Sequence, residues 1–592
     1  GGGGENLLFS VVKGPDWLGI DEEGILRGTP GPVDVGTAEV IVAVVDGVGS
    51  SVARFDLVVA PAPEMTRAPL PGINGEEAVV FGVLPDTQGT WDGVPRDEIN
   101  SIAPRLIAHG PDFVIHVGDV TDGNSEIGDV KLAQLEYLKE LLVTPLSEAG
   151  IGFYPVRGNH DANAYKNTSR GVSAWAAAFP FLFEGEHPLV DPTDVPGGSP
   201  ESPNDSNFCY VYSPSENVFF VSVDQWNGGE DDHNYSDWVA RKFVEIRADH
   251  PDAHIFGYSH SGLFATSIHP AMSEFVAGGA GPYLEAGRLA RIDGWFSGHN
   301  HIYDRSMAIN LSEGNEPYLF DFTCGSASEK FYPMTRPPVE DQHLNRVVDS
   351  TTTRGQPITY LLVKIIGPFV QVEAYMSPDT DGQGSFNDWS VWDAYTYSRN
   401  GHQFTVAAGE SYTDREIEDA APDEVGFLGT TVSIRDGINS DRTVYAADGE
   451  RFSPYRNITT GWWKREEWYD AGDVTIVSDI VSIHGMSNDT ARNRSDSYTL
   501  VLGYEGSHLS NEEAANLRIA AFLQGDTWEE GPGVWFDAVD ATLAPSVSTK
   551  PLMRAPRADD PLGSWGIDLS GKAVWARLDY QGDFAIACNG DR

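Results

Sequence analysis

The sequence has few cysteines, few lysines and no long apolar run, and each shortage excludes a class of protein. Its three cysteines, Cys209, Cys324 and Cys588, are too few for a disulfide scaffold, and no Cys-x-x-Cys metal knuckle occurs. Two alternatives stay open: Cys209 pairs with Cys324, or all three are reduced, buried thiols. No apolar run reaches the length of a membrane span, so no transmembrane segment is expected.

Positive charge is also scarce. The chain of 592 residues has 39 Lys and Arg, only 10 of them Lys, against 88 Asp and Glu, which gives a formal net charge of −49. Such an acidic protein repels nucleic-acid backbones, so no nucleic-acid binding is expected. With 41% hydrophobic residues the chain is globular, and its length suggests several domains. It begins with four glycines and no signal segment, which we interpret as a processed or truncated start.

The distribution of strand-like and helix-like segments predicts three regions and a linker. Short β-branched runs dominate the first 60 residues, and a Pro-rich stretch follows them. From residue 77, buried-type strands alternate with helical segments, as in an α/β layered domain. Residues 377–403 are polar and rich in Gly and Asp, and the β pattern resumes after them. We predict a β module at 1–62, a linker at 63–76, an α/β domain at 77–400 and one or more β-rich domains at 401–592.

Within the α/β region, individual elements can be placed. We expect strands at 77–84, 112–118, 151–158, 218–224, 253–259 and 292–298, helices at 96–110 and 129–146, and a hairpin of 359–366 with 369–376.

The first region also carries a set of short turn motifs. They are Trp17-Leu18, Gly24-Ile25-Leu26, Gly28-Thr29-Pro30, Asp34-Val35-Gly36 and Asp46-Gly47. With these motifs, residues 7–60 resemble the cadherin-like, immunoglobulin (Ig)-like modules of bacterial surface proteins, with the first strand missing. The resemblance implies an Ig-like spacer or anchor that attaches the chain to a cell surface or extracellular matrix.

Five expected strands of the α/β region end in residues that can bind a metal. These residues are Asp86 and Gln88, Asp119 and Asp122, Asn159 and His160, His260, and His299 and His301. Side chains on loops at strand ends are held by a rigid sheet, which an open α/β site requires. One such residue alone would indicate a turn or a helix cap. Five motifs in this order indicate a site for two metals.

The motif set D-x-[H/Q], G-D-x-x-D, G-N-H-D, a later His and G-H-x-H resembles the calcineurin-like metallophosphoesterases over about residues 75–375. The resemblance implies an α/β/β/α double-sheet sandwich and a dinuclear metal centre. Together with the strand patterns on either side, the expected fold is this sandwich flanked by an all-β Ig-like N-terminal domain and a β-sandwich C-terminal domain. By residue, the resemblance implies that Asp86, Gln88 and His301 bind the first metal, Asn159, His260 and His299 the second, and Asp119 both. It makes His160 a general acid oriented by Asp122. The alternative for Asp122 is a turn cap.

Three departures from the family motifs narrow the choice of subfamily. Gln88 stands where many relatives have His, so a weaker, neutral ligand faces the first metal. Asp122 replaces the Tyr of purple acid phosphatases, and Gly123 replaces the Arg of protein Ser/Thr phosphatases, so both subfamilies are disfavoured. The run His301-Ile302-Tyr303-Asp304-Arg305 resembles the tail of secreted relatives. Arg305 is then either a structural ion-pair partner or a substrate contact.

The mixed nitrogen and oxygen donors indicate transition metals, which we expect to be Zn, Mn or Fe in divalent or trivalent form. We predict a secreted or surface-attached phosphatase or phosphodiesterase, a hydrolase in which a metal-bridging hydroxide attacks a small phosphate ester. Its expected location is extracellular, on the cell surface or periplasmic. The alternative is an extracellular structural or binding protein that retains a little-used phosphoesterase core.

Long loops are expected to line the substrate pocket. They are residues 162–207, 226–238 and 326–358, the last of which contains Lys330. Tyr165, Lys166, Arg170 and His233 are candidate substrate contacts, with ordinary solvated loop residues as the alternative. The C-terminal β region shows no cluster of His and Asp in its sequence, so we expect no catalytic group there.

Overall fold

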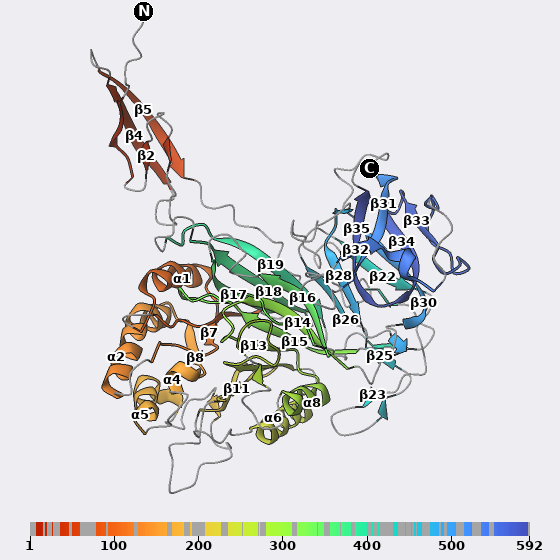
Figure 1. Cartoon of the computed structure of the whole chain (residues 1–592), viewed down its shortest axis with the longest axis horizontal. Coiled ribbons are helices and arrows are strands. Elements are labelled where there is room, and N and C mark those ends of the chain that lie inside the picture. The colour runs from red at the N-terminus through yellow and green to blue at the C-terminus, as the bar shows by residue number, and fades with distance from the viewer. Residues whose placement is uncertain are drawn as a thin grey trace, which may run out of the picture. The chain divides into compact units, whose positions relative to one another are not determined.

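A computed structural model describes most of the chain (Figure 1). The described residues are 8–15, 18–20, 26–27, 36–45, 50–59, 78–89, 93–123, 128–162, 169–182, 190–191, 208–225, 235–250, 253–269, 271–272, 280–310, 316–339, 341–348, 356–366, 369–379, 385–398, 405–407, 412–413, 430–435, 444–445, 451–452, 455–457, 459–463, 474–484, 487–489, 494–504, 514–523, 534–543 and 550–589. The chain forms two compact units, Gly1–Pro69 and Leu70–Arg592.

The first unit is built from antiparallel strands. Strands β1 (Leu8–Lys13), β4 (Gly36–Val45) and β5 (Ser50–Val59) form a sheet in the order β1-β4-β5, and β2 (Gly19–Ile20) pairs with β3 (Leu26–Arg27). The β-branched runs of the sequence lie in β4 and β5, which pair in register over all ten residues. The Ig-like assignment of this unit stays a prediction.

A sheet of twelve strands runs through the second unit. One half of this sheet consists, in order, of β19 (Ser390–Ser398), β18 (Phe369–Ser377), β17 (Ile358–Ile366), β6 (Val79–Leu84), β7 (Phe113–His116) and the edge strand β8 (Gly152–Pro155). Strands β6, β7 and β8 are parallel, and parallel neighbours need crossover connections. These are α1 (Arg96–His109) and the run α2 (Gly128–Leu138), a π-helical turn (Lys139–Val143) and α3 (Thr144–Glu148).

A second sheet of eight strands has the order β16-β14-β15-β13-β12-β11-β10-β9. Its strands are β9 (Val190–Asp191), β10 (Tyr210–Ser215), β11 (Val218–Val223), β12 (His254–Ser259), β13 (Gly294–Ser297), β14 (Tyr303–Asn310), β15 (Glu316–Cys324) and β16 (Gln342–Val348). Helix α6 (Ser236–Asp249) connects β11 to β12, and α8 (Gly281–Ala290) lies between β12 and β13. Short helices α4 (Asn159–Ala162), α5 (Ser169–Ala178) and a 3₁₀ turn (Pro180–Leu182) follow β8.

Aromatic rings join the two sheets face to face. Phe81 of β6 contacts Phe220, Phe256 and Phe296 of the eight-stranded sheet, with ring centroids 4.9, 5.9 and 5.8 Å away. All four rings are fully buried, which contributes roughly 2–3 kcal/mol for each ring. Because α6 and α8 pack on the other face of the eight-stranded sheet, the layers are helix, sheet, sheet and helix. The predicted sandwich is therefore present, with mixed sheets.

The twelve-stranded sheet continues past residue 400. Strand β19 pairs with β26 (Thr459–Trp463), and the sheet then runs through β28 (Ile480–His484), β35 (Gly582–Asn589), β31 (Leu517–Leu523) and β32 (Val534–Asp537), with β27 (Val474–Ile476) beside β35. The interpretation of residues 377–403 as polar and outside the β pattern is wrong for 390–398, because β19 occupies the centre of this sheet. The boundary at 400/401 stays a prediction, and the strands on its two sides share one sheet.

The C-terminal region also has smaller sheets. A six-stranded one contains β21 (Tyr412–Thr413), β22 (Thr431–Arg435), β29 (Ser487–Asp489), β30 (Arg494–Gly503), β33 (Trp565–Asp568) and β34 (Ala573–Tyr580). It packs on β28, β31 and β35 to form a separate apolar core. Two strand pairs complete the described elements, β20 (Thr405–Ala407) with β25 (Tyr455–Asn457) and β23 (Val444–Tyr445) with β24 (Arg451–Phe452), together with a 3₁₀ turn (Ala538–Ala541).

The three cysteines are free thiols, so the alternative of a Cys209–Cys324 disulfide is excluded. Cys209 and Cys324 are buried, and Cys588 is half-buried. Among the described helices, none combines the length and the apolar character that a membrane crossing requires.

Candidate metal centre

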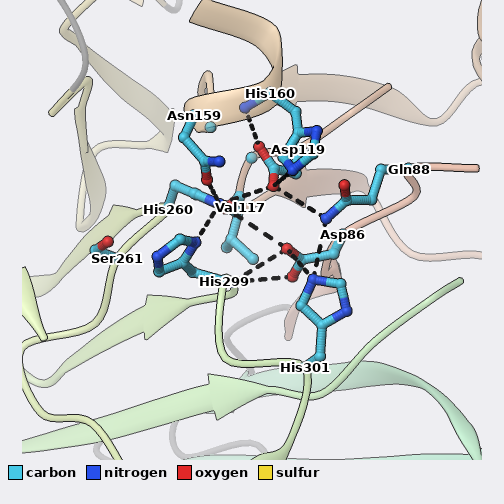
Figure 2. A network of polar contacts seen from close by, with 12 residues as sticks. Asp86, Gln88, Val117, Asp119, Asn159, His160, His260, Ser261, His299 and His301 are labelled. Atoms are coloured by element: carbon cyan, nitrogen blue, oxygen red, sulfur yellow. Dashed lines mark hydrogen bonds and ion pairs between the residues drawn. The ribbon is translucent and has the colours of Figure 1, made fainter. Parts of the chain in front are cut away.

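The seven predicted ligands come together from five loops at one end of the two facing sheets. Loops after the parallel strands β6, β7 and β8 supply Asp86, Gln88, Asp119 and Asn159, and loops after β12 and β13 supply His260, His299 and His301. Figure 2 shows their side chains pointing toward a common point. That these side chains bind metals stays a prediction, but their convergence is what that prediction requires.

The imidazole of His260 lies at the middle of the cluster. Its Nδ1 is 2.9 Å from the carbonyl oxygen of Val117 and donates to it, which leaves Nε2 facing the other side chains. Nε2 lies 3.2 Å from Asp119 Oδ2, 3.1 Å from Asn159 Oδ1 and 3.1 Å from the Nδ1 of a second imidazole, that of His299. Because those oxygens are acceptors, they repel the Nε2 lone pair unless Nε2 carries a proton or a cation lies between them.

The electrostatics of His260 agree with this geometry. Its side chain is fully buried, and burial alone favours the neutral imidazole. The nearby carboxylates of Asp119 and Asp86 nevertheless raise the pKa of His260 to about 9. The surroundings of Nε2 therefore favour positive charge, as a site for divalent ions must.

Asp86 and His301 form the other side of the cluster. His301 Nδ1 donates to the carbonyl oxygen of Lys330 at 2.8 Å, so its Nε2 faces Asp86 Oδ1 at 3.3 Å. The backbone N–H of His299 donates to both carboxylate oxygens of Asp86 at 3.1 Å. This bond fixes the carboxylate and the loop that carries the two histidines.

The backbone is unusual at three of the predicted ligands. Asp119, His299 and His301 have φ angles of 51°, 65° and 48°, and they are half of the six non-glycine residues with positive φ in the described part of the chain. A positive φ costs about 1–3 kcal/mol at a non-glycine residue and is retained where function needs it. Before Asp119, Gly118 has φ 95°, and a Cβ there would lie 2.6 Å from the His260 ring.

His160 and Asp122 lie at the edge of the cluster. His160 Nδ1 is 2.7 Å from the carbonyl oxygen of Asp122 and 3.3 Å from its Oδ1, and its Nε2 is 4.0 Å from Asp119 Oδ2. Burial lowers the pKa of His160, but Asp119 and Asp122 raise it more, to about 9. The His160 side chain is 29% exposed, so it is accessible from solvent.

The amide of Gln88 is oriented with its NH₂ group toward the cluster and its oxygen toward Lys330. Its Nε2 lies 3.0 Å from Asp119 Oδ2 and 3.0 Å from His301 Nε2, while its Oε1 accepts from Lys330 Nζ at 2.6 Å. Ligation of a metal through Oε1 would turn the amide NH₂ toward the Lys330 ammonium. The predicted ligand role of Gln88 therefore requires Lys330 to move as well.

Sequence reasoning assigned no role in the centre to Lys330, Asp161 or His269. Lys330 Nζ contacts Asp122 Oδ1 at 2.8 Å as well as Gln88. Asp161 accepts from the backbone N–H groups of Val120 and Gly158 at 3.0 Å, so it ties two of the ligand loops together. The His269 ring lies 4.4 Å from that of His299.

Only two of these residues had a sequence signal. Lys330 is one of few lysines and lies in the predicted pocket-wall segment, and Asp161 is the last residue of the G-N-H-D motif. His269 is an isolated histidine without a motif. Burial, followed by the neighbouring imidazoles, lowers its pKa to about 4.

The structure answers one of the other open questions. Arg305 is buried, and its guanidinium contacts Asp393 at 2.9 and 3.3 Å and stacks on Tyr395. It is therefore a structural ion-pair partner. The candidate substrate contacts Tyr165, Lys166 and His233, and the side chain of Arg170, lie outside the described residues.

The donor set fits a pair of transition metals. Asp119, His260 and His299 place their ligand atoms within 4.8 Å of one another. Asp119 Oδ2 lies 3.2 Å from His260 Nε2 and 3.0 Å from Gln88 Nε2, so this carboxylate adjoins a predicted ligand of each metal. Two adjacent cations need a shared anionic oxygen, which Asp119 is placed to provide.

A comparison with protein-family models agrees with this geometry. Residues 80–303 match the family model of the calcineurin-like phosphoesterases. Similar solved structures include PhoD (12% identity, 61% of this chain and 75% of that one, TM-score 0.39), a purple acid phosphatase from seeds of yellow lupin, Lupinus luteus (12%, 66% and 69%, TM-score 0.37), and a dimetal phosphatase from Danio rerio (12%, 50% and 96%, TM-score 0.34). With TM-scores below 0.5, these similarities carry no argument about substrate.

A search of curated proteins finds no match. The family match covers the loops after β6, β7, β8, β12 and β13 that hold all seven predicted ligands. Residues 80–303 are therefore a calcineurin-like phosphoesterase domain.

Proposed function

We propose that this protein hydrolyses small phosphate esters, with two metals held by the seven converging residues and with His160 as the proton donor. The observation that carries the proposal is the position of His260 Nε2, which faces Asp119 Oδ2, Asn159 Oδ1 and the His299 ring within 3.2 Å while Nδ1 is held by a carbonyl. Three loops from two sheets meet at this atom, and a cation bound there would offset the repulsion between their lone pairs.

Two bound metals would lower the pKa of a water molecule and neutralise charge on the phosphoryl oxygens. The side chains supply the rest. Asp119 offers the shared carboxylate, and it is suited to this because His260 and His160 hold its pKa well below the usual range although burial alone would raise it. It therefore remains an anion at any pH at which the enzyme would work.

His160 is placed to protonate the leaving group. His160 Nδ1 donates to the backbone carbonyl of Asp122 and lies 3.3 Å from Asp122 Oδ1, which favours the imidazolium form. The ring is partly exposed, while the predicted ligands around it are nearly all buried. A proton on Nε2 would thus face an ester oxygen bound at the edge of the cluster.

Lys330 supplies positive charge at the same edge. Its ammonium contacts Gln88 Oε1 and Asp122 Oδ1, and its side chain is 23% exposed. A single cation beside the metals suits a monoester, which carries more charge than a diester, so we favour phosphate monoesters over diesters as substrates.

We also propose that the protein is secreted or attached to a cell surface through its β-rich regions. The strongly acidic composition and the β unit at Gly1–Pro69 support this location. Fractionation of the producing cells, with detection of this chain, tests it: recovery in the cytoplasmic fraction alone would contradict the proposal.

The chemical proposal is tested by elemental analysis combined with a panel of phosphate mono- and diesters. We expect two bound metals at the centre and turnover, and we expect Asp119→Asn to lose both. Asp293→Asn is the matched control, because Asp293 is also a buried carboxylate beside a histidine, 3.1 Å from His254. Two metals at the centre without turnover of any ester would instead favour a binding protein with an unused core.

A further inference from the structure

A second group of metal-binding side chains lies away from the candidate metal centre, on three strands. His343 of β16, His484 of β28 and Asp583 of β35 place one ligand atom each within 4.8 Å of one another. We call these three residues the three-strand cluster. It shares no residue with the candidate metal centre. Two of its members, His484 and Asp583, lie beyond residue 400 and are far apart in the sequence. The expectation that the C-terminal region contains no catalytic group stays a prediction.

The carboxylate of Asp583 is the anionic member of the three-strand cluster. Its side chain is fully buried, and its Oδ2 is 3.1 Å from His343 Nε2. Ser482 Oγ donates to Oδ1 at 2.6 Å, and Asn345 Nδ2 lies 3.4 Å from both oxygens. Asp583 is therefore a buried carboxylate that these side chains hold in place.

His484 is the member without a hydrogen-bond partner at the atom that faces the others. Its side chain is 4% exposed, and Nε2 is a buried atom that makes no hydrogen bond in the described part of the chain. That atom lies 3.9 Å from Asp583 Oδ1. A buried polar atom left without a partner costs about 1–3 kcal/mol, so a missing partner is implied.

The spacing of the donors fits one metal ion. Zinc binds imidazole nitrogen and carboxylate oxygen at about 2.0–2.2 Å in a tetrahedron, so neighbouring ligand atoms lie about 3.3–3.5 Å apart. The observed separations of 3.1 and 3.9 Å lie on both sides of that value. The His343 side chain is 16% exposed, which gives an ion access from solvent and leaves room for a water ligand.

We propose that His343, His484 and Asp583 bind a single divalent transition-metal ion of the zinc type, as a structural site. Two imidazoles and one carboxylate are a donor set that zinc accepts. The ion would connect β16, at the edge of the eight-stranded sheet, to β28 and β35 of the twelve-stranded sheet. It would thereby fasten the C-terminal strands to the phosphoesterase core. The competing interpretation is a metal-free ion pair of His343 and Asp583.

Metal stoichiometry distinguishes these interpretations. The full-length protein, dialysed against Zn²⁺ and freed of excess, should contain one more zinc per chain than His484→Gln. The matched control is His254→Gln, because His254 and Asp293 form another buried pair at 3.1 Å, without a second imidazole among the described residues. This control should retain the full zinc content. Wild type with no more zinc than His484→Gln would overturn the proposal.

Two further measurements keep the test independent of catalysis and of folding defects. In an Asp119→Asn background, which removes the shared ligand of the candidate metal centre, added Zn²⁺ should still raise the unfolding temperature, and the added change His484→Gln should abolish that increase. Ester turnover by the single variant His484→Gln should stay within about twofold of wild type. If Asp583→Asn and His484→Gln both retain the wild-type zinc content, the site does not exist, whatever their stability.

Discussion

Replacing Lys330 by glutamine should change the pH dependence of catalysis in a defined direction. Lys330 Nζ and His160 Nδ1 contact the same atom, Asp122 Oδ1, at 2.8 and 3.3 Å, so the two nitrogens are at most about 6 Å apart. The positive charge of Lys330 lowers the pKa of His160. Its removal should therefore raise that pKa and move the alkaline limb of the kcat profile, where the acid loses its proton, to higher pH.

The size of the shift follows from Coulomb's law. Two unit charges about 6 Å apart interact by about 0.7 kcal/mol at a dielectric constant of 80 and by about 2.8 kcal/mol at 20. These energies correspond to about 0.5 and 2 pKa units. The two side chains are 23% and 29% exposed, so solvent screens their interaction and the lower half of this range applies. We therefore expect the pKa of His160 to rise by about 0.5–1 unit.

The assay is the kcat–pH profile of the metal-loaded protein on an alkyl phosphate, whose leaving group needs protonation. Lys330→Arg keeps the charge and is the control, so its alkaline limb should stay in place. Metal content should be the same in all three proteins, so that the contribution of the metals cancels in the comparison. An unchanged limb in Lys330→Gln, or an equal shift in Lys330→Arg, would refute the electrostatic link between Lys330 and His160.

Three other changes test separate parts of the molecule. His160→Asn should reduce turnover of alkyl phosphates by about 10²–10⁴ and of nitrophenyl phosphates by less, with metals retained; equal losses would mean that His160 does not protonate the leaving group. Asp393→Asn leaves the buried Arg305 without its carboxylate and should lower the free energy of unfolding by about 3–5 kcal/mol in urea titrations, whereas Glu39→Gln breaks an exposed ion pair and should leave it nearly unchanged. Burial raises the pKa of Glu98 to about 7 from an ordinary 4.5, so the folded state prefers the protonated form and loses stability as pH rises between these values. Glu98→Gln should remove that loss, and a Tm difference between variant and wild type that does not grow from pH 5 to pH 7 would contradict the assignment.

The candidate metal centre could be placed from the sequence because its residues follow strands directly. Asp86, Asp119 and His260 each come one to three residues after a buried strand, and parallel strands bring their ends together without any further information. Lys330 could not be placed in this way, since its contact with Gln88 joins residues 242 positions apart through an irregular segment.

The errors in the fold predicted from the sequence have a similar cause. Strand β19 was not recognised because Asp393 occupies a buried position and makes the segment look polar, and its partner Arg305 is 88 residues earlier. The helix α6 begins at Ser236, inside a segment interpreted as a loop insertion. His484 and Asp583 lie on strands that pair only in the folded sheet, so no motif connects them.

The position of β35 in the twelve-stranded sheet determines when this sheet can be completed during synthesis. Strands β6 to β8 and β17 to β19 are all made by residue 398, and domains generally fold from the N-terminus as they emerge. Strand β35, at residues 582–589, lies between β28 and β31. The nascent sheet therefore presents β19, and then β28, as an unpaired edge over most of the last 190 residues, which is the period when edge-to-edge association with other chains must be avoided.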